Sequence, residues 1–283
     1  MQDPSKSVDR YLEGRTAAVT GGLSGQGLAI AAELARRGAN ICAGSMLDVH
    51  AGSAGDAAEY PDREALAEVR ESLRRHGVLV RACHLDVRRQ ELVDRFVEEA
   101  RAMTGSVDIL INAAGTTAEQ GVCGHGDELW NRIIDTNLTG AFRMARACLP
   151  DMMEKRWGRI INIGSTAASV GWKDNPAYCA SKAGLLGLTR CIALEGASRG
   201  VSCVMVSPTW VETGLMRRNV EQVAARSESG RGADELTAEI VAQNPQGRLI
   251  KPHEIASLCA YLCRDEAFGI TAEDIQVSGG AMW

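Results

Sequence analysis

The sequence lacks the features that mark several large classes of protein. Its net charge of −5 over 283 residues provides no basic field to attract nucleic acid or an anionic membrane, so we expect neither as a partner. No stretch of about 20 apolar residues occurs, so no membrane span is expected. The first residues, MQDPSKSVDRYLEGR, have no apolar core of the kind that a signal peptide needs. We interpret residues 1–13 as a polar lead-in to the first strand.

Cysteine and histidine are present, but not in patterns that hold metals. The nine cysteines are scattered, odd in number and mostly placed inside apolar runs, and no two CxxC pairs occur. Buried free thiols in a reducing cytoplasm account for them best. The five histidines are scattered as well, and surface or packing roles are their default interpretation. The sequence therefore predicts no metal site and a cytoplasmic location.

Short apolar runs rich in β-branched residues alternate with longer stretches of helical periodicity. This alternation predicts one α/β domain with a parallel sheet, right-handed crossovers and helices on both faces. Expected strands cover residues 16–20, 40–45, 79–87, 107–115, 159–165, 201–208 and 274–280, and expected helices cover about 25–37, 61–75, 92–103, 127–156, 177–199 and 252–263.

Residues 214–246 interrupt this alternation with a long polar stretch between a strand and a helix. A long insertion in a compact domain is usually a lid or a mobile loop, and we expect a substrate lid here. A passive surface insertion is the alternative.

A glycine-rich turn, TGGLSGQG at residues 20–27, follows the first strand and precedes the first helix. Gly21 allows a tight turn, Gly25 lets the backbone approach a pyrophosphate, and Gly27 permits close packing of the helix on the strand. The helix N-terminus would then present free N–H groups and a positive dipole end to the phosphates. An ordinary glycine-rich turn is the alternative.

The spacing of this turn, TGxxxGxG, is shared with other motifs that occur in order along the chain. They are DILINAAG at 108–115, DTNLTGAF around Asn137, INIGS ending at Ser165, YCASK at 178–182 and SPTWVET at 207–213. Together they resemble the short-chain dehydrogenase/reductase family. Ala113 replaces a second asparagine of the family pattern, and Thr209 replaces its usual glycine. The resemblance implies a Rossmann-type doubly wound, mostly seven-stranded parallel sheet, an NAD(P) cofactor and a homotetramer.

The resemblance identifies Asn137, Ser165, Tyr178 and Lys182 as the catalytic residues of a ketone or secondary-alcohol oxidoreductase. Tyr178 and Lys182 are four apart on a predicted helix and share one face. A tyrosine pKa near 10 is too high for a base at neutral pH, and a nearby ammonium would lower that pKa. Ser165 would stabilise charge on the substrate oxygen. By resemblance, Lys182 holds ribose hydroxyls and Asn137 supports a water that relays protons. A packed aromatic with a polar tip is the alternative for Tyr178.

The resemblance also carries over a set of cofactor contacts, of which Asp86 has a strand-end cap as its alternative role. The set is Gly21, Ser24, Gly25, Gln26, Gly27, Ser45, Met46, Asp86, Val87, Asn112, Ala113, Gly115, Tyr178, Lys182, Pro208, Val211 and Thr213.

The end of the second strand distinguishes NAD from NADP in this family. NAD enzymes usually carry an acid there, which bonds the ribose 2′-hydroxyl. Ser45 and Met46 present no carboxylate to repel a 2′-phosphate, but residues 44–50 and Ser24 offer no arginine or lysine to attract it. Asp48 is close enough in sequence to turn back. We favour NADP and keep NAD as the alternative.

The segment from 112 to 165 and the ending GRLIKPHEIASLCAYLCRDEAFGITAEDIQVSGG look most like the 3-oxoacyl-carrier-protein reductase branch. The alternatives are a sugar, polyol or other secondary-alcohol dehydrogenase, a lyase or epimerase with transient oxidation, and a non-catalytic dinucleotide-binding protein. Arg156 and Arg199 would face an acidic carrier protein in that branch, or are plain surface charge. The expected substrate is a small carbonyl or alcohol compound, in a pocket lined by Thr116, Trp172, Trp210, Leu215 and Met216.

Overall fold

Seven parallel strands form one sheet in the computed structural model, which describes residues 9–47, 61–226 and 230–281. The strand order is β3-β2-β1-β4-β5-β6-β7, so the chain starts at the centre, builds one half and crosses β1 to build the other. This is the doubly wound arrangement that the family resemblance implies, with the parallel sheet that the alternation predicts. The strands are β1 (Thr16–Thr20), β2 (Asn40–Ser45), β3 (Val80–His84), β4 (Ile109–Asn112), β5 (Gly158–Ile163), β6 (Val201–Pro208) and β7 (Asp274–Val277).

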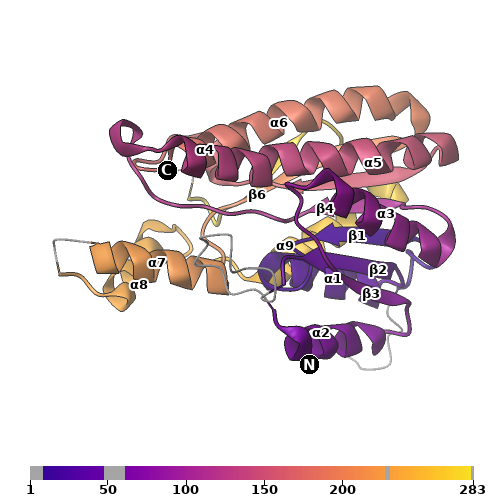
Figure 1. Cartoon of the computed structure of the whole chain (residues 1–283), viewed down its shortest axis with the longest axis horizontal. Coiled ribbons are helices and arrows are strands. Elements are labelled where there is room, and N and C mark those ends of the chain that lie inside the picture. Colours follow the sequence, from indigo (N-terminus) through magenta and orange to yellow (C-terminus); the bar gives the residue numbers. More distant parts are fainter. Residues whose placement is uncertain (1–8, 48–60, 227–229, 282–283) are drawn as a thin grey trace.

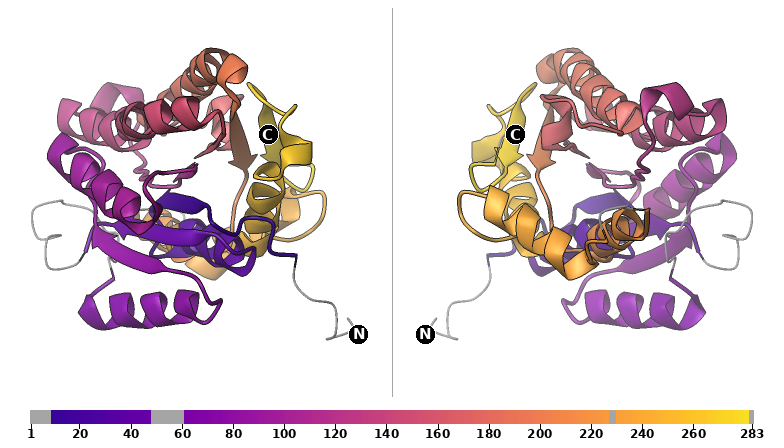
Figure 2. Two further views of the ribbon diagram at one scale, coloured as in Figure 1. Left: turned by 90° about the vertical axis from the view of Figure 1, so that its right-hand side faces the viewer. Right: turned by 90° about the vertical axis from the view of Figure 1, so that its left-hand side faces the viewer.

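Helices cover both faces of the sheet (Figures 1 and 2). One apolar cluster joins the sheet to α1 and α9, with Leu73 of α2 at its edge, and a second joins it to α3, α5 and α6. Every residue of β1, β4, β5 and β6 is buried, as expected for parallel strands that are covered on both sides. These helices are α1 (Gly25–Arg36), α2 (Arg63–Arg74), α3 (Gln90–Thr104), α5 (Gly140–Lys155), α6 (Pro176–Gly196) and α9 (Pro252–Leu262).

The single helix predicted over residues 127–156 is interrupted. The structure has α4 (Asp127–Ile134), then a π-helical turn (Asp135–Thr139), then α5. The π turn holds Asn137 at only 2% exposure. π turns of this kind occur frequently at functional sites, and apolar periodicity does not reveal them.

Residues 214–246 contain two helices where the sequence analysis expected an irregular insertion. These are α7 (Gly214–Arg226) and α8 (Ala233–Gln243), and they project beyond the sheet in orange in Figure 1. Met216 and Val220 are buried on one side of α7. Tertiary packing therefore stabilises this helix, which its polar sequence does not predict. Short 3-10 turns cover Val122–Gly124, Thr166–Ala168, Ala197–Arg199 and Asp265–Ala267.

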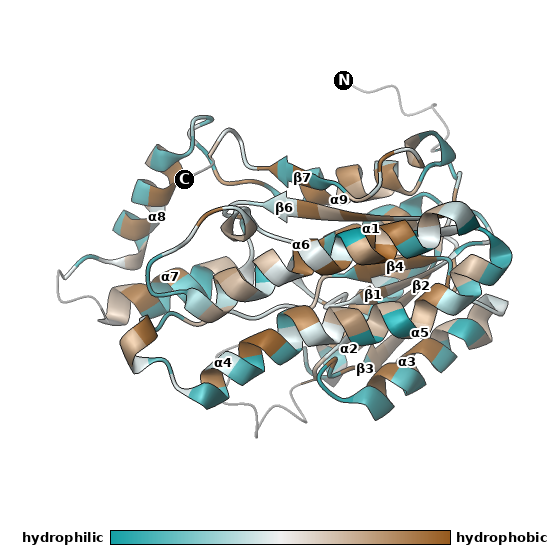
Figure 3. Cartoon of the chain, turned by 90° about the horizontal axis from the view of Figure 1, so that it is seen from above, coloured by the Kyte–Doolittle hydropathy of each residue, from teal (hydrophilic) through white to brown (hydrophobic). Residues whose placement is uncertain are grey.

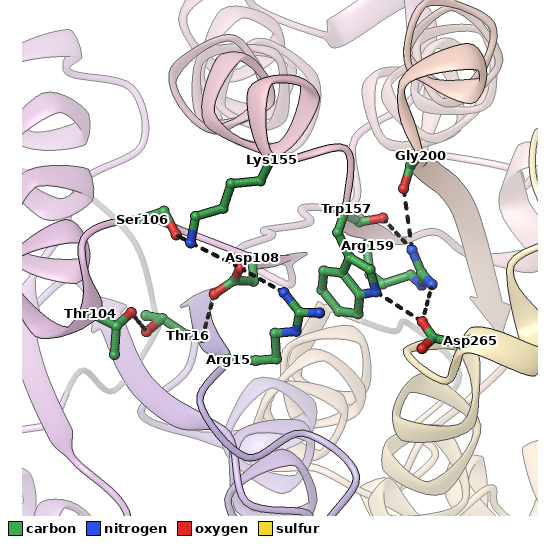
Figure 4. Close-up of polar contacts among 11 residues, drawn as sticks. Arg15, Thr16, Thr104, Ser106, Asp108, Lys155, Trp157, Arg159, Gly200 and Asp265 are labelled. Carbon is green, nitrogen blue, oxygen red and sulfur yellow. Dashed lines mark hydrogen bonds and ion pairs between the residues drawn. The ribbon is translucent and has the colours of Figure 1, made fainter.

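A polar cluster closes the amino end of the sheet (Figure 4). Asp108, at 1% exposure, accepts the backbone N–H of Thr16 at 2.9 Å and lies 3.4 Å from Arg15 and 3.6 Å from Lys155. Beside it, the Trp157 ring lies between two guanidinium groups, with that of Arg15 3.8 Å from its centroid. This cluster ties the starts of β1, β4 and β5 together, at the end of the sheet away from the glycine turn.

Candidate active site

The carboxyl ends of parallel strands meet at one edge of the sheet, which is where doubly wound folds bind ligands. A cleft of about 390 Å³ lies at this edge. Most of the predicted cofactor contacts line it, namely Gly21, Ser24, Gly25, Gln26, Gly27, Ser45, Met46, Asp86, Val87, Ala113, Gly115 and Thr213. Segments far apart in the sequence therefore converge on one elongated cleft, as a dinucleotide requires.

The glycine turn has the geometry that a phosphate-binding turn needs. Gly21 has a φ of +65°, and a Cβ there would lie 2.8 Å from the carbonyl oxygen of Ala113. A Cβ on Gly27 would lie 2.2 Å from the carbonyl oxygen of Gly21. Only glycine therefore lets α1 start so close to β1 and β4, with its N-terminal N–H groups at the cleft. These residues fit a nicotinamide dinucleotide.

Five predicted contacts do not line this cleft. Tyr178 and Lys182 lie on α6, and the other three lie at the same edge of the sheet as the cleft. Asn112 donates from Nδ2 to Asn162 Oδ1 at 2.8 Å, which joins the ends of β4 and β5. Pro208 is the last residue of β6, and Val211 forms a bridge with Ile250. Their side chains support the walls around the cofactor position.

The end of β2 is joined to the glycine turn. The hydroxyl of Ser45 accepts the N–H of Leu23 at 3.3 Å and is largely buried. It keeps its own proton to donate towards the cleft. Asp48, considered above as a ribose partner, lies outside the described residues.

Arg88 is a cleft residue that the sequence analysis missed. It follows β3, lines the cleft and lies 3.7 Å from Met46 Sδ, measured from Nη2. Its Nε and Nη2 bond both oxygens of Asp86, at 2.9 and 2.8 Å. Burial alone would raise the pKa of Asp86, but the hydrogen bonds from Arg88 outweigh it and hold this pKa below its usual value. The sequence could have indicated this role, because Arg88 directly follows the third expected strand, and neighbouring parallel strands end at the same edge of a sheet.

Arg218 of α7 is a second arginine that the sequence analysis missed. It lines the cleft with Thr213 and Gly214, and a Cβ on Gly214 would lie 3.1 Å from its Nη1. Thr213 in turn lies against Gly25 of the phosphate-binding turn. A cation thus stands beside the place where a pyrophosphate would lie, on the helix predicted to belong to a lid.

The four predicted catalytic residues come together next to the cleft. Tyr178 and Lys182 lie on the first turns of α6, with the Lys182 Nζ 5.7 Å from the Tyr178 ring centroid. Ser165 follows β5 and makes a side-chain hydrogen bond with Tyr178. A Cβ on Gly115 would lie 3.8 Å from the Lys182 Nζ and 3.5 Å from Asn137 Oδ1, so these two groups flank Gly115.

Burial controls the ionisation of this group. It raises the pKa of Tyr178 above its usual value, and the hydrogen bond from Ser165 opposes the rise without reversing it. It lowers the pKa of Lys182 to about 8. The expectation that the Lys182 ammonium lowers the tyrosine pKa is therefore wrong in net direction, because desolvation of the phenolate dominates.

Asn137 connects the π turn to the loop after β4. Its Oδ1 accepts the N–H of Thr116 at 2.8 Å, and its Nδ2 donates to the Thr116 carbonyl at 2.9 Å and to Ser181 Oγ at 3.0 Å. Lys182 Nζ donates to the Ile163 carbonyl at 2.7 Å. These bonds fix the strand ends around the two side chains.

The predicted pocket residues divide between two cavities. Thr116 and Leu215 line the cofactor cleft, whereas Trp172 and Trp210 line a second cavity beside it. Met216 lines neither and is buried in α7.

The two arginines considered as contacts for a carrier protein lie away from the site. Arg156 ends α5 before β5 begins, and Arg199 precedes β6. Both are therefore at the amino end of the sheet, across the strands from Ser165 and Tyr178.

Among the described residues, no group of three or more histidine, cysteine or acidic side chains could hold a metal ion. None of their helices is long and apolar enough to cross a bilayer.

A glycine-lined cleft at the carboxyl edge, flanked by Ser165, Tyr178 and Lys182, defines a dinucleotide-binding oxidoreductase. A family model described as enoyl-(acyl carrier protein) reductase matches residues 21–282. The chain belongs to the short-chain dehydrogenase/reductase family and is an NAD(P)-dependent oxidoreductase acting at a CH–OH or ketone group.

Two curated relatives cover nearly the whole chain. The 3-oxoacyl-[acyl-carrier-protein] reductase FabG of Escherichia coli is 37% identical over 268 residues, which are 95% of this chain and 97% of that protein. The D-beta-hydroxybutyrate dehydrogenase of Cupriavidus necator is 34% identical over 270 residues, which are 95% and 98% of the two chains.

Two solved structures share the fold. A xylitol dehydrogenase bound to NAD⁺ superposes with a TM-score of 0.84 at 28% identity, covering 95% of this chain and 99% of the other. A variant of actinorhodin polyketide ketoreductase with NADPH gives a TM-score of 0.83 at 32% identity, covering 95% and 97%.

Proposed function

We propose that this protein reduces the ketone of a 3-oxoacyl compound with NADPH. The observation that carries this proposal is the half-buried Tyr178, which lies beside Ser165 and next to the cofactor cleft. Since burial raises its pKa, the phenol stays protonated at neutral pH and can give a proton to a ketone oxygen. The relatives at 37% and 34% identity are named for 3-oxoacyl and 3-hydroxy compounds, which supports this substrate class.

In the proposed reaction the bound dinucleotide supplies a hydride to the carbonyl carbon. Tyr178 protonates the carbonyl oxygen, and Ser165 donates a hydrogen bond to it, which stabilises the negative charge that develops there. The Ser165 hydroxyl also accepts the N–H of Ala167 at 3.1 Å, which fixes its orientation. Lys182 holds the ribose of the cofactor, and Asn137 keeps the loop at Thr116 in place.

The choice of NADPH over NADH rests on the charges around β2. No carboxylate stands at Ser45 or Met46, and the guanidinium of Arg88 lies beside Met46. Asp86 places a carboxylate in the cleft lining, and both of its oxygens are bonded by that guanidinium. A 2′-phosphate would therefore meet a cation at this end of the cleft.

Three further parts of the proposal concern the molecule as a whole. We place it in the cytoplasm, because all nine cysteines are free thiols. We propose that α7 and α8 form the substrate lid. We also propose a homotetramer, supported by three exposed apolar side chains, one on each of the helices α4, α5 and α6 (Figure 3). They are Trp130, Phe142 and Leu194.

A substrate assay tests the proposed activity. Oxidation of NADPH and of NADH is followed with the acetoacetyl thioester of N-acetylcysteamine and, in parallel, with a ketose. We expect reduction of the thioester with preference for NADPH, and a loss of about a hundredfold or more in kcat for Tyr178→Phe. Turnover of the ketose alone would replace the proposal with a polyol dehydrogenase, and a Tyr178→Phe variant that keeps more than about a tenth of kcat would remove Tyr178 from its role.

A further inference from the structure

A second cavity, of about 350 Å³, lies beside the catalytic residues. It is bounded by the segment after β5, by the residues after β6, and by α8 with the chain that follows it. Its lining residues are Glu119, Thr166, Gly171, Trp172, Lys173, Asn175, Thr209, Trp210, Ile240, Gln243, Asn244, Arg248, Leu249 and Ala281. This volume is in the range of sites for small organic molecules.

The cavity adjoins the groups that would carry the reaction. Thr166 directly follows Ser165, and Asn175 is the N-cap of the helix whose first turn carries Tyr178. A ketone whose oxygen lies between Ser165 and Tyr178 therefore has its substituent within reach of this cavity.

Two tryptophans form one wall of the cavity. The rings of Trp172 and Trp210 are stacked, with their centroids 5.2 Å apart and their planes 26° from parallel. The pair joins the loop after β5 to the loop after β6, so it spans the two segments that border the substrate position.

The wall is fixed from both sides by backbone contacts. The N–H of Trp172 donates to Cys179 Sγ at 3.3 Å, and the carbonyl of Trp210 accepts the N–H of Ile250 at 3.1 Å. A ligand thus meets indole surface that is already in place, which reduces the entropy lost on binding.

The charges around the cavity do not favour one sign. Glu119 and Lys173 carry opposite charges, and Arg248 is bonded to both carboxylate oxygens of Glu254, at 2.7 and 2.8 Å. Ile240 and Leu249 add apolar surface. The lining therefore suits an uncharged group with a flat face.

We propose that the ketone substrate carries a flat ring next to its carbonyl, and that this ring packs against the wall made by Trp172 and Trp210. This proposal rests on the ketone-reductase function above and names the substituent that the enzyme selects. Aromatic contacts of this kind contribute about two- to tenfold in affinity beyond area burial. The two tryptophans are the residues that determine this specificity.

Two 3-oxo esters with the same number of carbons, one with a ring and one with an open chain on the ketone, test the proposal. Ethyl benzoylacetate bears a phenyl ring on its ketone, and ethyl 3-oxononanoate bears an open chain with the same number of carbons. The measured quantity is the ratio of kcat/KM for the ring ester to that for the chain ester. Comparing this ratio between variants cancels the difference in intrinsic reactivity of the two ketones.

The variants are Trp172→Leu and Trp210→Leu, with Tyr261→Leu, which alters an exposed aromatic side chain of α9, as the matched control. We expect the ratio to fall about tenfold in each cavity variant, mainly through KM, and to stay unchanged in the control. Thermal melts establish that each variant is folded. An unchanged ratio in both cavity variants would overturn the proposal.

A binding measurement separates this proposal from the proposed function. Calorimetric titration of each ester is done in the presence of oxidised cofactor, where no reduction occurs. Tighter binding of the ring ester without reduction of any ketone would support ring packing against Trp172 and Trp210 and refute the reductase function. Reduction of both esters with equal binding would support the reductase function and refute ring packing against Trp172 and Trp210.

Discussion

Lys182 illustrates at the scale of one residue how catalysis and stability oppose each other. The residue is only 5% exposed, and its ammonium donates a hydrogen bond to the Ile163 carbonyl. Burial lowers its pKa to about 8, which means that the folded state disfavours the charged form. Its proposed role in holding the ribose of the cofactor would account for the retention of this costly group.

We expect Lys182→Met to unfold at higher temperature than the wild type below pH 8. There the ammonium is charged in both states, and the folded state bears the full cost of burying it. The gain is about 1–3 kcal/mol after loss of the hydrogen bond to Ile163. It shrinks as pH rises from about 8, where the folded lysine loses its proton, to the range where the unfolded lysine does so too.

Thermal melts of both proteins at pH 6 and at about pH 10 measure this effect, and other titrating groups cancel in the difference. Dinucleotide binding, measured by titration, should weaken in the same variant. A variant that is less stable than wild type at pH 6 would show that burial of the ammonium is not costly.

The catalytic residues illustrate what sequence can and cannot supply. Tyr178, Lys182 and Ser165 were predicted from spacing and resemblance, and the structure brings all three together. The direction of the tyrosine pKa was not predictable, because it depends on how completely three-dimensional packing removes water from the phenol.

At the scale of elements, the residues at the ends of β2 and β3 together line one part of the cleft. Arg88 follows β3 but lies beside Met46 after β2, and the register pairs Ser45 with His84. The segment after β2 does not by itself reveal this arginine, because Arg88 belongs to the end of the neighbouring strand.

We expect Arg88→Gln to weaken NADPH more than NADH, since it removes a cation and leaves Asp86 to repel a 2′-phosphate. Ser45→Asp should act in the same direction, because its carboxylate repels the phosphate and can accept bonds from both ribose hydroxyls of NADH. Like charges a few ångströms apart at a partly exposed site cost about 1–4 kcal/mol, or roughly tenfold to a few hundredfold in relative kcat/KM. Kinetics with both cofactors measure the ratio.

Two controls accompany these variants. Arg89→Gln alters the adjacent exposed arginine, which pairs with Glu91, and should leave the ratio unchanged. Met46→Arg should raise the preference for NADPH by adding a second cation. If Arg88→Gln and Ser45→Asp both leave the ratio within about twofold, the 2′-phosphate does not lie at this end of the cleft.

The helices show where periodicity fails as a guide. Residues 127–156 have continuous helical patterning, yet the π turn at Asp135–Thr139 divides them. Its cause is tertiary, because Asn137 bonds the distant Thr116 backbone. Helix α7 was missed for the opposite reason, since its polar sequence gains helical stability from the packing of Met216 and Val220.

At the scale of the whole molecule, the two ends of the sheet have separate tasks. The carboxyl end holds the cleft, and the amino end holds the cluster around Asp108 (Figure 4). The parallel sheet with helices on both faces followed from alternation, and the doubly wound arrangement followed from the resemblance. This cluster followed from neither, because Arg15, Asp108 and Lys155 are far apart in the sequence and carry no motif.

We expect Asp108→Ala to lower the free energy of unfolding by about 3 kcal/mol. The substitution leaves the buried N–H of Thr16 without its acceptor and removes a buried counter-charge of Arg15. Activity per folded molecule should stay unchanged. Urea denaturation measures the loss. Glu98→Ala, which removes an exposed partner of Arg101, is the control and should cost less than about 1 kcal/mol. Equal losses in the two variants would show that burial at Asp108 adds nothing.

The strand order also has a consequence for synthesis on the ribosome. Strands β1, β2 and β3 come from the first part of the chain and can pair before β4, whose residues Ile109–Asn112 emerge later. Until then β1, the centre of the finished sheet, is an open edge whose N–H and C=O groups have no neighbour on one side. The nascent chain is therefore most prone to pair with other chains in this interval, and arrival of β4 ends it.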